Sequence, residues 1–159
     1  MNFATADLCD QFEDRVRVVE GPLRDFGGRP SFHGRIETVK TFEDNSLVRA
    51  CLDESGQGRV LVVDGGGSLR RALLGDQLAA LAFEHDWSGL VINGCIRDAA
   101  AIAQIDLGVK ALATHPRKTL KQGFGERGVS VRFGNVDFVP GHYLYADQDG
   151  VVIAETALL

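Results

Sequence analysis

Two continuously apolar runs, VLVVD (60–64) and LVIN (90–93), constrain the possible fold more than any other feature of the sequence. Each is followed by residues with helical apolar spacing, LGDQLAALAFEHDW (74–87) and RDAAAIAQI (97–105), and VKALAT (109–114) forms a third strand-like run. A strand that is apolar at every position is buried on both faces, which is typical of a parallel sheet covered by helices. This rhythm therefore predicts an α/β fold with a partly parallel sheet.

The last third of the chain has a different pattern. VSVRFG and VDFVPG flank Gly134-Asn135, and YLYADQDGVVIA contains the turn pair Asp149-Gly150. Such pairs favour tight turns between antiparallel strands. We therefore expect residues 129–154 to form antiparallel hairpins that close the domain.

The first third predicts shorter elements. In chain order, they are a helix capped by Thr5, an extended run at 16–19, an irregular loop at 21–34, a strand at 34–42 and a helix opened by Asp44 or Asn45.

The composition fits a single domain over residues 1–159, because 45% apolar residues in a chain of this length can bury a sizeable core. The 17 basic and 22 acidic residues give a net charge of −5, which offers no broad cationic surface to nucleic acid. No run approaches membrane-spanning length, and Cys9, Cys51 and Cys95 suit reduced core thiols. We expect a cytoplasmic protein with no membrane and no direct nucleic-acid partner.

Ligands of parallel α/β folds bind at the carboxyl ends of strands, so the residues after each apolar run are the candidates for chemistry. After the first run, Gly65–Gly67 leave the backbone uncovered, which allows either a flexible turn or the close approach of a ligand or another chain. They match neither a P-loop nor the GxGxxG fingerprint. Asp76 stands where helical spacing begins, and it either caps that helix or marks an anion-binding helix start.

The second strand exit places Arg97 and Asp98 side by side before a row of alanines. Asp98 can cap the alanine helix, in which case Arg97 is a solvated side chain. An ion pair between adjacent residues is poorly placed, because their side chains point in different directions. Arginine suits a carboxylate or an enolate oxygen, and aspartate suits a hard cation such as Mg²⁺. Together with a helix start, the pair suits a small oxo acid.

Long stretches of the chain resemble one protein family over nearly the whole length. They are TADLCDQF, FGGRPSFHGRIETVKTFEDN, GRVLVVDGGGSLRRALLGDQLAALA, GLVINGCIRD and YLYADQDGVVIA. The family contains the regulator of ribonuclease E activity A and the metal-dependent 4-hydroxy-4-methyl-2-oxoglutarate aldolases. Its aldolase-competent members carry an aspartate, twenty further residues and then Arg-Asp, and Asp76, Arg97 and Asp98 have that spacing. The overall sequence is most similar to the regulator type.

The resemblance implies an α/β/β sandwich of the swivelling-domain type, assembled as a homotrimer with sites near the subunit contacts. It also implies roles for six residues. Backbone amides of Gly75, Asp76, Gln77 and Leu78 would bind the substrate's carboxylate, Arg97 would contact its keto oxygen, Asp98 would ligate Mg²⁺ or Mn²⁺, and Asp76 would orient a water on the metal.

The implied reaction is retro-aldol cleavage of 4-hydroxy-4-methyl-2-oxoglutarate to two pyruvates. Oxaloacetate decarboxylation is implied as a secondary activity, because both reactions pass through the pyruvate enolate. No Schiff-base lysine is required, and none of the four lysines stands in the motif. The larger aldolases of the family supply an acidic residue from a C-terminal extension to a neighbouring subunit, and Glu155 is the nearest candidate in this chain.

The alternative function is that of a protein-binding regulator that inhibits ribonuclease E, with or without residual lyase activity. A net acidic trimer can imitate the charge of RNA and so cover an RNA-binding region. The two functions are compatible, because a catalytic site and a binding surface can coexist on one fold.

Overall fold

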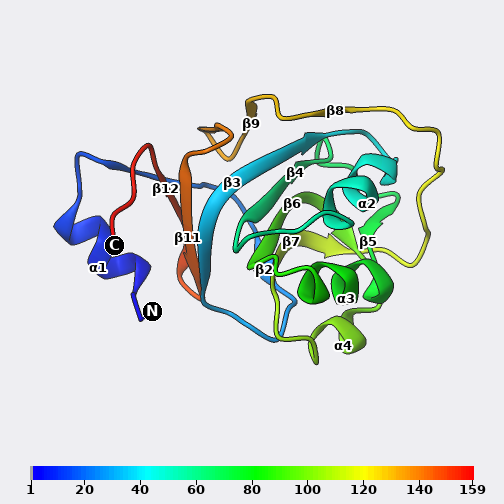
Figure 1. Cartoon of the computed structure of the whole chain (residues 1–159), viewed down its shortest axis with the longest axis horizontal. Helices are drawn as coiled ribbons and strands as arrows, with labels where there is room; N and C mark the ends of the chain where they lie inside the picture. The colour runs from blue at the N-terminus through cyan, green and yellow to red at the C-terminus, as the bar shows by residue number, and fades with distance from the viewer. Residues whose placement is uncertain (1) are drawn as a thin grey trace.

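One long strand, β3, joins the two halves of the fold in the computed structural model, which describes residues 2–159 (Figure 1). The elements, in chain order, are α1 (Thr5–Gln11), β1 (Val16–Val18), β2 (Arg24–Asp25), β3 (Phe32–Lys40), α2 (Ser46–Leu52), β4 (Val60–Asp64), β5 (Ala72–Leu74), α3 (Asp76–Glu84), β6 (Gly89–Ile96), α4 (Ala99–Ile102), β7 (Gly108–Thr114), β8 (Glu126–Arg127), β9 (Val131–Phe133), β10 (Val136–Phe138), β11 (Tyr143–Asp147) and β12 (Gly150–Ala154).

The main sheet has the strand order β1-β12-β11-β3-β4-β6-β7-β2, with β5 paired to β6 and β8 paired to β3. The first residues of β3, from Phe32 to Arg35, pair antiparallel with β11. Its later residues, from Ile36 to Lys40, pair parallel with β4. An antiparallel half and a parallel half therefore share one strand, and the sheet curves around it (Figure 1).

Three apolar clusters separate the layers. In β4, Leu61 and Val63 pack under helices α2 to α4, whereas Val60 and Val62 face the opposite cluster with β9 to β12. The third cluster lies between α1 and the outer face of β11 and β12, at the left of Figure 1. The chain thus forms a layered α/β/β arrangement, and both faces of the VLVVD strand are buried, as its sequence predicts.

The predicted mixed sheet with C-terminal hairpins is confirmed, including the β9–β10 turn at Gly134 and Asn135, both with positive φ. The second hairpin differs by one residue, because Asp147 pairs with Gly150 and the turn is therefore Gln148-Asp149. Strand β5 was not predicted, because it has only three residues and no periodicity. The helix predicted at 97–105 is only the four residues of α4.

The predicted capping role of Thr5 is wrong. Ala4 occupies the N-cap position of α1, and Thr5 instead donates through both its amide and its hydroxyl to the Asp147 carboxylate, at 2.7 and 2.6 Å. The cysteine prediction holds for two residues, because Cys51 and Cys95 are buried whereas Cys9 is half-buried. No helix within residues 2–159 is long and apolar enough to cross a membrane.

The ring of Phe32 packs on two glycines that face each other in neighbouring strands, Gly89 of β6 and Gly108 of β7. A Cβ built on Gly108 would lie 2.1 Å from Cδ1 of this ring, and one on Gly89 would lie 2.5 Å from Cδ2. Phe32 is only 2% exposed, so its ring has no free space to move into. The two glycines therefore set how closely the start of β3 approaches β6 and β7.

We predict that Gly108→Ala lowers the free energy of unfolding by about 2–3 kcal/mol, because the new methyl group overpacks the contact with Phe32. Urea unfolding measures the change. Gly150→Ala is the matched control, because a Cβ there has no atom within 4 Å, and it should change stability by less than about 0.5 kcal/mol. Equal effects of the two substitutions would contradict the packing argument.

Candidate functional site

The ends of β5 and β6 bring the two predicted segments of the site together. The strands run parallel with Leu74 opposite Ile96, and the Arg97 amide donates to the Leu74 carbonyl at 2.9 Å. Gly75 and Arg97 therefore leave the sheet side by side. All six predicted site residues, Gly75, Asp76, Gln77, Leu78, Arg97 and Asp98, line one cavity of about 160 Å³. Their chemical roles remain predictions.

The Asp98 carboxylate caps a helix other than its own. Asp98 has φ 57° and ψ 41°, in the left-handed region, and makes no side-chain cap to α4. Its Oδ2 instead accepts a hydrogen bond of 3.0 Å from the Asp76 amide, the first amide of α3. The capping alternative for Asp76 is therefore wrong, because Gly75 holds the N-cap position of α3. For Asp98 the predicted position is right, since it is the N-cap residue of α4, but its side chain caps α3 instead.

The hydrogen bond between Asp98 and α3 depends on the absence of a side chain at Gly75. A Cβ on Gly75 would lie 2.8 Å from Oδ2 of Asp98 and 3.4 Å from Nε of Arg97. The sequence suggested only a backbone amide at this position. The structure adds that Arg97 and Asp98 pack directly against the bare backbone of the α3 start.

The cavity has a second, cationic wall that the sequence reasoning missed. Arg49 of α2 lines it, together with Lys118 and Lys121 from the loop after β7. None of these three residues, nor Arg97, forms an ion pair within residues 2–159. Their position in the sequence indicates a place in the site, because both lysines follow the carboxyl end of the parallel strand β7. Both lysines lie outside the Asp-x20-Arg-Asp motif, so the motif alone does not point to them.

The charges that line the cavity favour an anion. The four cations outnumber the two carboxylates, Asp76 and Asp98, and the α3 start adds amides that have no partner within the helix. Because Asp98 already occupies the Asp76 amide, the amides of Gln77 and Leu78 are the ones left for a ligand. The cavity has room for several ordered waters or for a small organic acid.

The donor set suits a divalent cation that keeps most of its waters. Within residues 2–159, no three His, Cys, Asp or Glu side chains come close enough to hold a metal together. Asp98 uses Oδ2 on the helix amide, and Oδ1 has no hydrogen-bond partner among the described residues. Mg²⁺ typically binds through one or two carboxylates together with waters and substrate oxygens, so Asp98 fits such an ion.

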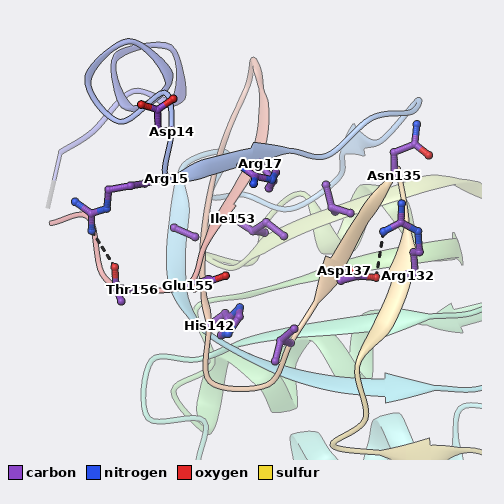
Figure 2. Close-up of a pocket in the computed structure, with 13 residues that line it drawn as sticks. Asp14, Arg15, Arg17, Arg132, Asn135, Asp137, His142, Ile153, Glu155 and Thr156 are labelled. Atoms are coloured by element: carbon purple, nitrogen blue, oxygen red, sulfur yellow. Dashed lines mark hydrogen bonds and ion pairs between the residues drawn. The ribbon is translucent and has the colours of Figure 1, made fainter.

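A larger cavity of about 540 Å³ lies elsewhere, between β1, β12 and the β9–β10 hairpin (Figure 2). Only two of its charged side chains pair with each other among residues 2–159. Arg132 pairs with Asp137 at 3.1 Å, and Arg15 donates to the Thr156 hydroxyl at 2.9 Å. Glu155 lines this cavity and not the one that contains Asp98. Size alone therefore does not identify the site.

The glycines Gly65–Gly67 form a tight turn outside the site cavity. Gly66 and Gly67 have positive φ, and the Gly66 amide donates to Oδ1 of Asp64 at 3.0 Å. A Cβ on Gly66 would lie 2.8 Å from the Phe42 ring. The group that packs closely against Gly66 is therefore the Phe42 ring of the same chain.

Residues 5–153 match the RraA-like family, described as Aldolase/RraA. A relative from Aromatoleum aromaticum, named a proposed 4-hydroxy-4-methyl-2-oxoglutarate aldolase, is 57% identical over the full length of both chains. A structure described as an S-adenosylmethionine:2-dimethylmenaquinone methyltransferase from Geobacillus kaustophilus is 52% identical, with TM-score 0.97 over 98% of this chain and 97% of that one. The RNA-processing inhibitor RraA from Thermus thermophilus is 42% identical, with TM-score 0.96 over 100% and 96%.

These three names describe three different activities on one fold. These proteins share the fold of this chain, but the fold does not decide among their activities. That choice depends on the chemistry of the site.

We predict that Asp98→Ala lowers the free energy of unfolding by about 1–2 kcal/mol, because α3 loses its capping carboxylate and alanine is unfavourable at positive φ. Asp98→Asn should change stability by less than about 0.5 kcal/mol, because asparagine tolerates this conformation and keeps an acceptor oxygen. Urea unfolding compares the two. Asp106→Ala, which removes the exposed partner of Arg29, is a surface control and should unfold at the same urea concentration as the wild type.

Proposed function

The chain belongs to the RraA-like family, and from that premise we propose that it is a divalent-metal-dependent carbon–carbon lyase acting on small 2-oxo acids. The proposed reaction is the cleavage of 4-hydroxy-4-methyl-2-oxoglutarate to two pyruvates. One observation carries the proposal: the Arg97 guanidinium, the Asp98 carboxylate and the free amides of the α3 start meet in one cavity.

The start of α3 binds the carboxylate next to the keto group. The amides of Gln77 and Leu78 have no partner within the helix, and the positive end of the helix dipole favours an anion there. Arg97 leaves the adjacent strand and donates to the keto oxygen. Anchoring the carboxylate and the adjacent keto oxygen fixes the orientation of the rest of the substrate in the cavity.

Cleavage breaks the bond between C3 and C4 as the C4 hydroxyl loses its proton. The electron pair moves through C3 to the keto oxygen, which leaves one pyruvate as its enolate and the other as a free product. Arg97 stabilises the negative charge that develops on this oxygen. Asp76, exposed at the start of α3, orients a water for the proton transfers, and protonation of C3 completes the second pyruvate.

Asp98 would hold the cation through Oδ1 while Oδ2 keeps its hydrogen bond to α3. Mg²⁺ or Mn²⁺ bound there supplies Lewis-acid stabilisation of the same enolate. Loss of CO2 from oxaloacetate gives this enolate too, so we propose oxaloacetate decarboxylation as a secondary activity.

We also propose that the chain assembles as a homotrimer whose contacts lie near the site. Phe42 and Phe124, which are 55% and 66% exposed, line a neighbouring cavity of about 440 Å³, and such exposed rings favour burial against another subunit. A partner can also supply the acidic groups that the site lacks within one described chain. Light scattering on the purified protein tests the assembly, and Phe124→Asp should shift the mass toward that of the monomer.

The test of the lyase is pyruvate release from 4-hydroxy-4-methyl-2-oxoglutarate with Mg²⁺ or Mn²⁺ and again after removal of metal with EDTA. We expect turnover only with metal, and a loss of at least about 100-fold in kcat/KM for Asp98→Ala, which removes the metal ligand. Glu84→Gln, on the exposed last residue of α3, is the control and should retain wild-type rates. Absence of metal-dependent pyruvate release would refute the proposal.

Inhibition of ribonuclease E is the second candidate, favoured by the 42% identity and TM-score of 0.96 to the RNA-processing inhibitor RraA. We expect the purified chain to bind ribonuclease E and to slow its cleavage of RNA at micromolar concentration. Asp98→Ala should inhibit as well as wild type, because a docking surface does not need the metal ligand. Unchanged RNA cleavage would remove this candidate.

A further inference from the structure

The loop between β7 and β8 forms one wall of the site. We call residues 117–125 the site loop. Its start pairs with β5, because the Ala72 amide donates to the Arg117 carbonyl at 2.7 Å. Lys118 and Lys121 of this loop line the site cavity, and both are exposed. The position of these two charges therefore depends on what holds the loop backbone in place.

The main anchor of the site loop is the carboxylate of Asp44, which is 3% exposed. Its Oδ1 accepts from the amide and hydroxyl of Ser46, at 2.9 and 2.6 Å, and so caps the start of α2. Its Oδ2 accepts from the amides of Gln122 and Phe124, at 2.8 and 3.2 Å. One oxygen thus serves the helix and the other serves the site loop.

This carboxylate is ionised throughout the neutral range. Burial by itself raises the pKa of Asp44, but the hydrogen bonds from Ser46, Gln122 and Phe124 outweigh it and lower the pKa to about 2. An ionised acceptor makes these hydrogen bonds stronger than a neutral one would.

A second contact fixes the middle of the loop. The hydroxyl of Thr119, a residue that is 3% exposed, donates to Oδ1 of Asn45 at 2.8 Å and accepts from the Asn45 amide at 3.2 Å. Asn45 in turn donates to the Leu73 carbonyl of β5 at 3.3 Å. Lys118 and Lys121 flank this buried threonine. The α2 start therefore holds the site loop at two places, and both places lie next to the lysines.

We propose that Asp44 is a positioning residue of the active site, which holds the site loop so that Lys118 and Lys121 bind the second carboxylate of a dicarboxylate 2-oxo acid. This inference rests on the proposed function. Arg97 and the α3 amides take the first carboxylate and keto group, which leaves Lys118 and Lys121, neither of which forms an ion pair within residues 2–159, for the distal carboxylate.

The experiment is a double-mutant cycle on KM for 4-hydroxy-4-methyl-2-oxoglutarate. We expect Asp44→Asn to raise KM about tenfold with kcat changed less than about threefold, because uniform substrate binding is lost and not the chemistry. The pair Lys118→Met with Lys121→Met should raise KM by the same factor. Combining all three substitutions should add little, because both changes remove one interaction.

Two controls separate positioning from general destabilisation. Asp53→Asn, on the exposed residue after α2, and Arg117→Met, an exposed cation of the site loop outside the cavity, should both keep the wild-type KM. Asp44→Ser keeps a short cap oxygen for α2 without reaching the loop, and it replaces Asp44→Asn if that variant does not fold. A wild-type KM in the Asp44 variant, or KM effects that multiply in the combined variant, would overturn the inference.

Calorimetric binding of 2-oxoglutarate with Mg²⁺ separates this inference from the proposed reaction, because this dicarboxylate has no hydroxyl and is not cleaved. If the wild type releases no pyruvate, the lyase proposal fails, and binding still decides the role of Asp44. About tenfold weaker binding in both the Asp44 and the lysine variants, with 2-oxobutyrate binding unchanged, supports the inference. Equal affinity of wild type and variants for 2-oxoglutarate overturns it.

Discussion

Burial of β4 and β6 on both faces is the constraint on which the rest of the structure depends. Alternate residues of each strand enter opposite apolar clusters, so helices must cover one face and the antiparallel strands the other. The parallel strands then end at one edge, where the chain turns into α3 and α4. The site lies at this edge because the main chain has free amides there and side chains are not needed for the core.

The link between Asp98 and the first amide of α3 makes the two strand exits one unit. If Asp98 capped the helix that follows it, its carboxylate would point toward α4. The left-handed backbone conformation at Asp98 instead directs the carboxylate toward the start of α3. Gly75 leaves room for that contact. The same carboxylate thus has a structural oxygen and a free oxygen, and Asp44 divides its two oxygens between α2 and the site loop in a similar way.

Much of the fold was predictable because periodicity reports burial directly: VLVVD and LVIN became β4 and the core of β6. The first hairpin turns at the predicted Gly134-Asn135, and the second turns one residue earlier than the predicted Asp149-Gly150. Arg97 and Asp98 were found because they follow a strand end. The site loop could not be predicted in the same way. Its place depends on contacts between residues about 75 to 80 positions apart, such as Asp44 with Gln122, and no local pattern encodes them. The partner of Asp98 was missed for the same reason, since sequence shows only the helix next to it.

The contact of Phe32 with Gly89 and Gly108 has an evolutionary consequence. The three positions lie in three different strands but share one volume, so they cannot change independently. A relative that carries a side chain in place of either glycine needs a smaller residue where Phe32 stands, or a shifted β3. Because β3 belongs to both halves of the sheet, such a shift would alter the hairpin half as well. These three residues should therefore vary together across the family, even though none of them touches the site.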